Sequence, residues 1–141
     1  MSFIDNYKLL IAELVPFLKM VGYRKSGESF FLDKEGNIGL VNFQRSKNSN
    51  SSSILFTINL GVYSSALKMF DSFEVKSKPT LSDCHWRKRI GCLMPDRQDF
   101  WWEIDDTISS TKLAAEILDV LKERAIPEVE KFISNESLEK S

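Results

Sequence analysis

The clearest structural signal in the chain is the segment ILFTINLGVY at residues 54–63, in which side chains alternate strictly between two sides of an extended strand. One side is wholly apolar, whereas the other carries Thr57, Asn59 and Tyr63. A strand of this kind predicts a sheet with one side against a hydrophobic core and the other partly open to solvent.

Helical periodicity appears near both ends of the chain, where apolar residues recur at steps of three and four. Residues 3–21 predict an amphipathic helix that Pro16 should kink and Gly22 should end. A second helix should begin after a capping serine at 109 or 110, and Pro127 should either kink it or open a further helix reaching about residue 134.

Shorter segments between the helices predict further strands, at residues 29–32, 38–44, 85–92 and 100–105. The first two flank DKEGN, a hairpin connection in which Gly36 and Asn37 can adopt positive φ. The polar run 45–53 predicts a mobile loop, and Ser64 can cap a short helix at 65–70.

These elements together predict an α+β fold, with N- and C-terminal helices packed on one face of a single, largely antiparallel sheet of about five strands. We expect residues 1–141 to form a single domain, with roughly the last seven residues frayed, because no linker or internal repeat is visible.

Charge is balanced over the whole chain but not along it. The net charge is −1, which disfavours a protein built to coat nucleic acid. Residues 1–98 carry a net +5 and residues 99–141 a net −6. This split predicts an acidic C-terminal helix on a mildly basic sheet, or alternatively a basic sheet face that recruits an anionic partner.

The chain should reside in the cytoplasm. It shows no signal peptide, and its most apolar helical run, residues 9–18, is too short and too interrupted to span a membrane. In such a reducing compartment Cys84 and Cys92 should be free thiols.

Residues 83–105 hold all three tryptophans, both cysteines and the only histidine. If its two strands form a hairpin centred on Asp96, one face carries Trp86 and Ile90 while the arginines point to the other. This density of rare residue types predicts either a packed structural element or a binding site.

In that hairpin, Arg89 would face Glu103 and Arg87 would face Asp105, next to an exposed Trp101. Cross-strand ion pairs can simply fix the hairpin register, contributing roughly 0.2–1 kcal/mol each. Alternatively, arginines suit a carboxylate or phosphate, and a neighbouring tryptophan suits a ring. The candidate binding residues are Arg87, Arg89, Trp101, Glu103, Tyr63 and Asn59, with Asn42, Gln44 and Thr57 extending the same face.

His85 is the natural candidate for a general base, because its unperturbed pKa lies near neutrality. Asp83 or Glu103 would orient it in a small hydrolase or nuclease. No nucleophile elbow, HExxH or glycine-rich phosphate loop accompanies these residues, so the sequence favours a non-catalytic protein. Cys84, His85 and Cys92 lack metal-site spacing and a fourth ligand, so we expect no metal and no cofactor.

Four blocks of sequence resemble an uncharacterised bacterial family of domains of unknown function, family 4304. They are VNFQRS at Val41–Ser46, FTINLGVY at Phe56–Tyr63, DCHWRKRIG at Asp83–Gly91 and WWEID at Trp101–Asp105. The resemblance covers nearly the whole chain. It implies a stand-alone bacterial cytoplasmic domain and assigns no activity to any residue.

The sequence therefore favours a binding module that uses an open polar and aromatic sheet face to engage a protein or a small anionic ligand. The alternative is the hydrolase or nuclease built around His85. A third interpretation is single-stranded nucleic-acid binding through Trp101, Tyr63 and the basic groups at 45–47 and 87–89, which the charge balance disfavours. We expect a monomer or a weak homodimer formed through sheet edges.

Overall fold

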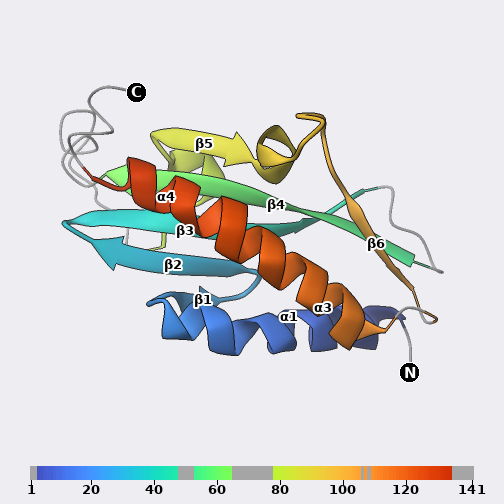
Figure 1. Cartoon of the computed structure of the whole chain (residues 1–141). Helices are drawn as coiled ribbons and strands as arrows, with labels where there is room; N and C mark the ends of the chain where they lie inside the picture. Colours follow the sequence, from blue (N-terminus) through green and yellow to red (C-terminus); the bar gives the residue numbers. More distant parts are fainter. Residues whose placement is uncertain (1–2, 48–52, 65–77, 106, 108, 135–141) are drawn as a thin grey trace.

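The computed structural model describes residues 3–47, 53–64, 78–105, 107 and 109–134, and in this part of the chain helices cover one face of a six-stranded antiparallel sheet (Figure 1). The α+β fold class predicted from the sequence is confirmed. The prediction of a single antiparallel sheet of about five strands is confirmed as well, and the sheet has six.

The helices are α1 (Phe3–Met20), α3 (Ser110–Val120) and α4 (Ile126–Phe132), and the strands are β1 (Arg24–Ser26), β2 (Ser29–Lys34), β3 (Asn37–Arg45), β4 (Ser53–Ser64), β5 (Trp86–Arg89) and β6 (Trp102–Asp105). Two short 3₁₀ turns, η1 (Leu81–Asp83) and η2 (Ile90–Leu93), flank β5. A π-turn, η3 (Leu121–Ala125), joins α3 to α4. Pro127 lies at the start of α4 and has no N–H to bond to the preceding turn, which explains the wider turn there.

The sheet order is β1-β2-β3-β4, with β5 and β6 both paired to the remaining edge of β4. β5 pairs with residues 59–62 of that strand and β6 with residues 53–56. The two strands therefore lie one after the other along β4 and do not pair with each other. The predicted hairpin centred on Asp96, with its Arg89–Glu103 and Arg87–Asp105 pairs, is wrong.

The loop that joins β5 to β6 closes on itself at Gly91. A Cβ atom built on Gly91 would lie 2.9 Å from Asp99 Cα and 2.9 Å from Phe100 N. The chain thus crosses closely over itself between leaving the sheet after Arg89 and rejoining it at Trp102. This crossing turns residues 90–101 into a closed loop rather than the connection of a hairpin.

The main core lies between the sheet and the three helices (Figure 1). Phe56, Ile58 and Leu60 of β4 are fully buried there, and Trp86 of β5 stacks on Phe132 of α4 with ring centroids 4.6 Å apart. Trp86 thus faces the helices, as the alternation in β5 predicts.

The opposite face of the sheet is less open than the sequence suggests. Tyr63 is fully buried in a second apolar cluster, which also contains Phe31, Ile38, Leu40 and Cys84. Thr57 and Asn59 are also buried, at 0% and 2% exposure.

Several turns and caps are local and agree with the sequence. Gly22 ends α1 with φ 99°, and the Ser109 side chain caps α3 by accepting a hydrogen bond from the Lys112 N–H. In the β2–β3 hairpin the two turn residues with positive φ are Glu35 and Gly36, at 55° and 79°, as a type I′ turn requires. Asn37 instead begins β3.

Three predictions concern residues outside the described ranges. They are the short helix at 65–70, most of the loop at 45–53 and the frayed last residues.

Candidate functional site

A row of polar side chains crosses the sheet on the face opposite the helices. Ser29, Asn42, Asn59 and Arg89 occupy directly paired positions on β2, β3, β4 and β5. Asn42 Nδ2 donates to Ser29 Oγ at 2.9 Å, Asn59 Nδ2 to Asn42 Oδ1 at 3.2 Å, and Arg89 Nε to Asn59 Oδ1 at 3.2 Å. Asn59 Nδ2 also donates to Gln44 Oε1 at 2.7 Å, so neighbouring side chains hold each other in place.

Arg89 ends this row and joins it to the loop 90–101. Its NH1 group donates to both Asp99 oxygens, at 3.3 and 3.2 Å, and its guanidinium lies 5.4 Å from the centre of the Trp101 ring. The Trp101 indole N–H donates to Asp99 Oδ2 at 2.8 Å. This bond and the Arg89 guanidinium hold the pKa of Asp99 below its usual value.

The structure thus brings together three of the six predicted binding residues, Asn59, Arg89 and Trp101, but as partners of one another or of Asp99. Of the remaining three, two lie apart from this group. Tyr63 is buried in the second apolar cluster, and Glu103 accepts a hydrogen bond from Ser53 Oγ at 3.3 Å near the far end of β4.

Arg87 and Thr57 complete the predicted face. Arg87 is exposed, and within the described ranges its side chain makes no hydrogen bond or ion pair. Thr57 Oγ1 donates to the Phe100 carbonyl at 2.6 Å, which ties the loop 90–101 down onto β4. The buried Tyr63 ring is not available to stack on a base, which counts against the nucleic-acid platform.

The structure does not bring the three candidate catalytic residues together as one group, because Glu103 lies far from His85. His85 Nδ1 accepts a hydrogen bond from the Ser64 N–H at 3.1 Å, at one end of β4. Asp83 Oδ2 accepts bonds from the N–H and hydroxyl of Thr80, at 2.8 and 3.0 Å. Glu103 pairs with a β4 position nine residues before Ser64, roughly 30 Å away at about 3.4 Å per residue. The prediction that Glu103 orients His85 is therefore wrong, and the version of the hydrolase that uses His85 with Asp83 stays a prediction.

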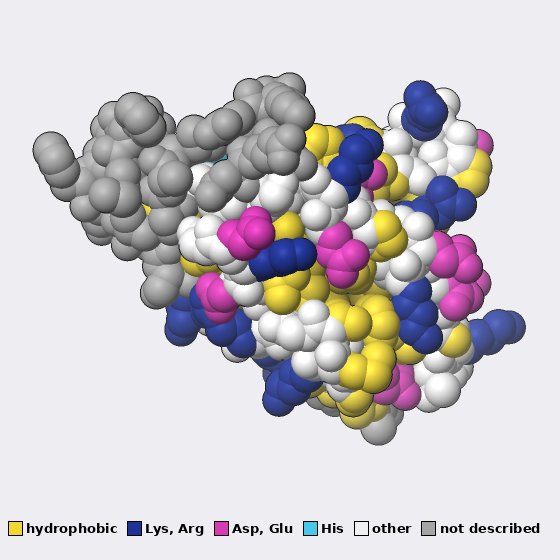
Figure 2. Space-filling model, turned by 60° about the vertical axis from the view of Figure 1, so that its left-hand side comes forward, with side chains coloured by type: hydrophobic (Ala, Val, Ile, Leu, Met, Phe, Trp, Pro, Cys, Tyr) yellow, Lys and Arg dark blue, Asp and Glu magenta, His cyan; other side chains and the backbone are white. Residues whose placement is uncertain are grey.

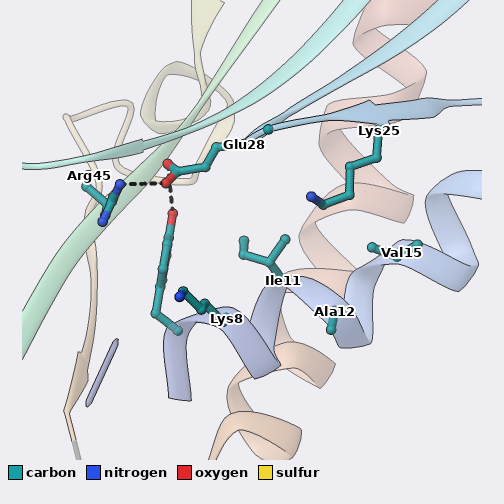
Figure 3. Close-up of a pocket in the computed structure, with 9 residues that line it drawn as sticks. Lys8, Ile11, Ala12, Val15, Lys25, Glu28 and Arg45 are labelled. Carbon is teal, nitrogen blue, oxygen red and sulfur yellow. Dashed lines mark hydrogen bonds and ion pairs between the residues drawn. The ribbon is translucent and has the colours of Figure 1, made fainter. Parts of the chain in front are cut away.

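A groove between α1 and the β1–β2 hairpin has a different character. Its volume is about 420 Å³, within the range of small-ligand sites. Ile11, Ala12 and Val15 supply an apolar wall from α1, and Lys25 points from β1 toward Ile11 (Figure 3). Lys8 lines the same groove from α1.

One acidic and one basic residue of the groove neutralise each other at one end. Arg45 NH2 lies 2.9 Å from Glu28 Oε1, and the Tyr7 hydroxyl donates to Glu28 Oε2 at 3.4 Å (Figure 3). Burial, and then the charge of Glu28, raise the pKa of Tyr7 well above its usual value, so its hydroxyl keeps the donated proton.

Lys8 and Lys25 are both exposed, and among the described residues neither has a hydrogen bond, an ion pair or an aromatic ring over its ammonium group. Since Glu28 is already engaged by Arg45 and Tyr7, the groove retains an excess of positive charge. The arrangement can hold an anionic group next to an apolar one.

Sequence reasoning missed this groove. Lys8 lies on the polar side of an amphipathic helix and Lys25 in a short polar segment, where lysines are ordinary surface residues. The useful signal was Gly27, which marks a tight turn and therefore a hairpin directly after α1.

Comparison with known families identifies the group to which the chain belongs. A family model described as Domain of unknown function (DUF4304) matches residues 14–131. The chain is a member of the DUF4304 family. The resemblance inferred from the four sequence blocks is therefore confirmed. No curated protein and no solved structure matches this DUF4304 chain.

Figure 2 shows one face of this DUF4304 protein, and the described part of that face is mixed in charge. Hydrophobic side chains lie there among both basic and acidic side chains. Within the described residues, no helix is long and apolar enough to cross a membrane, and no group of three or more His, Cys, Asp or Glu side chains is placed to hold a metal ion.

Proposed function

We propose that this protein is a non-catalytic binding module whose ligand carries an anionic group next to an apolar one. The observation that carries the proposal is the pair of lysines beside the apolar wall of the α1 groove, Lys8 and Lys25, which have no charged partner among the described residues. Burying the apolar part of a ligand against this wall removes apolar surface from water, and the ammonium groups attract its charge.

The chemistry of lysine sets the kind of anion. A lysine ammonium is a compact point charge with three donors, so it accepts a carboxylate, a sulfonate or a phosphate without a fixed two-point geometry. Two lysines on separate elements, α1 and β1, favour an anion held between them or two anionic groups on one ligand.

The polar row around Arg89 has weaker support as a ligand site. Its donors and acceptors bind one another, so a ligand would have to break existing hydrogen bonds to engage Asn59, Arg89 or Trp101. A ligand site at the six residues predicted from the sequence stays a prediction. A variant of two of these residues serves as the matched control in the experiment below.

We further propose that the protein works in a bacterial cytoplasm. Cys84 and Cys92 are both free, which agrees with a reducing compartment.

The experiment is an NMR titration with octanoate, following the amide signals of Ile11, Val15 and Lys25. Octanoate should bind, and octyltrimethylammonium, with the same chain and opposite charge, should not. The double variant Lys8→Gln/Lys25→Gln should weaken octanoate binding at least about tenfold, because each lysine makes a charge-assisted contact.

The matched control is Arg89→Gln/Trp101→Phe, which removes the charge and the indole N–H from the other candidate surface. It should bind octanoate like the natural protein. If it is the variant that loses binding, and the lysine variant binds normally, the ligand site belongs to the polar row and the proposed groove is wrong.

A further inference from the structure

Among the described strands, β1 is the outermost one beyond β2, and the α1 groove runs beside it. We propose that β1 accepts an extended acidic segment of a partner protein as an added strand, with one apolar side chain of that segment seated on Ile11 and Val15. This inference rests on the proposed function and specifies the ligand of the same groove.

The backbone of β1 has an N–H and a C=O group that can pair with an added strand. Ser26 and Ser29 flank the two-residue turn Gly27–Glu28, in which Gly27 has φ 62°. Residues that flank a two-residue hairpin turn form a hydrogen-bonded pair, and such pairs alternate with non-hydrogen-bonded ones. Lys25, paired with Phe30, is therefore at a non-hydrogen-bonded position, and its N–H and C=O point away from β2.

The edge and the groove are continuous. Lys25 and Gly27 line the groove together with the α1 residues, so a strand laid along β1 would place alternate side chains against α1. A peptide bound in this way gains main-chain hydrogen bonds from the edge and side-chain selectivity from the groove.

Charge complementarity selects the sequence of that strand. Lys25 points into the groove toward Ile11, with Lys8 on the facing helix (Figure 3). An acidic residue two positions before or after the apolar one would lie on the same side of the added strand and meet these ammonium groups. The fitting pattern is therefore acidic–x–apolar–x–acidic.

A second copy of the chain does not suit this edge. Two-fold pairing of β1 with its own copy would bring two sets of Lys8 and Lys25 together across one groove, and like charges placed opposite one another on paired strands are destabilising. Lysine on an edge strand is a known means of preventing self-association, and the same charge admits an acidic partner.

The probe is a fluorescein-labelled peptide, Thr-Glu-Thr-Leu-Thr-Glu-Thr with blocked ends, whose binding is followed by fluorescence anisotropy. A second peptide carries N-methyl groups on the Glu, Leu and Glu residues, which keeps the side chains but removes the edge hydrogen bonds. We expect the first peptide to bind and the methylated one to bind at least about fivefold more weakly, as the loss of main-chain hydrogen bonds implies.

Two protein variants separate the contribution of the Lys25 ammonium group to peptide binding from that of the Lys25 backbone N–H. Lys25→Gln removes the ammonium group and keeps the N–H, whereas Lys25→Pro removes both at an outward-facing position where proline is tolerated on an edge strand. Lys25→Pro should bind the unmethylated peptide about fivefold more weakly than Lys25→Gln does. Thermal unfolding of both variants checks that each is folded, and the methylated peptide provides the same test on the natural protein.

Equal binding of the two peptides, or of the two Lys25 variants, would overturn strand addition. If neither peptide binds but octanoate does, the peptide inference is wrong and the anion-binding groove stands. If neither peptide nor octanoate binds, both proposals fail.

Discussion

Of all the glycine-to-alanine substitutions in this chain, Gly91→Ala should lower the free energy of unfolding the most. The new Cβ atom would lie 2.9 Å from Asp99 Cα and 2.9 Å from Phe100 N, and both are backbone atoms that no rotamer change can move aside. The backbone it meets is also held in place, because the Phe100 carbonyl accepts the Thr57 hydroxyl at 2.6 Å and Asp99 binds Arg89.

The magnitude follows from this geometry. Forcing one extra methyl group into a well-packed site typically costs 1–3 kcal/mol, and the fixed backbone places Gly91 at the upper end, at about 3 kcal/mol. For a chain of this length that corresponds to a melting temperature lower by about 10 °C. The backbone at Gly91 is outside the left-handed region, so the whole cost comes from the collision.

Urea unfolding followed by tryptophan fluorescence measures the change, since Trp102 is buried in the core. The control is Gly27→Ala, at a position with φ 62° and nothing within 4 Å of the added Cβ, where backbone strain alone should cost about 1 kcal/mol. A loss below about 1 kcal/mol in Gly91→Ala would show that the loop moves freely off residue 91, and the account of the crossing would be wrong.

Two further predictions concern the polar row and the buried thiol. Asn59→Ala should lower the free energy of unfolding by about 2–3 kcal/mol, because it leaves three partners on the two neighbouring strands unsatisfied. Ser29→Ala, at the end of the row, should lower it by less than about 1 kcal/mol, and equal losses in urea unfolding would contradict a cooperative network. Burial raises the pKa of Cys84 from 9.0 to about 12. Between these two pH values the folded state keeps a thiol proton that the unfolded chain loses, so the free energy of unfolding should fall as pH rises from about 9 toward 12. Unfolding midpoints measured between pH 7 and 11 should decline less steeply for Cys84→Ala than for the natural protein, and identical slopes would refute this assignment.

The faces of the strands could be predicted because alternation is a local property. Trp86 and Lys88 lie on the helix side, where Trp86 stacks on Phe132 and the Lys88 ammonium is 3.6 Å from Glu128. Arg89 lies on the opposite side, as expected.

Strand pairing could not be predicted, because it depends on contacts between distant residues. The spacing of the two strands around Asp96 suits a hairpin, and only their pairing with two separate stretches of β4 shows that one does not form. β1 escaped notice because its sequence, Arg-Lys-Ser, has no apolar residue to alternate. The groove was missed for a related reason, since Lys8 and Lys25 become neighbours only when the first hairpin packs beside α1.

The docking of α1 against the C-terminal part of the fold determines when a growing chain can complete its structure. Asn6 Nδ2 donates to the Asp105 carbonyl at 3.0 Å, and Thr111 Oγ1 donates to Glu13 Oε1 at 2.8 Å, across about a hundred residues of sequence. During synthesis the apolar side of α1 must therefore wait, uncovered by α3, until that helix has emerged from the ribosome. Contacts between residues so far apart in sequence slow folding and lengthen the exposure of apolar surface, so newly made chains should depend on chaperones more than a protein of this size with local contacts would.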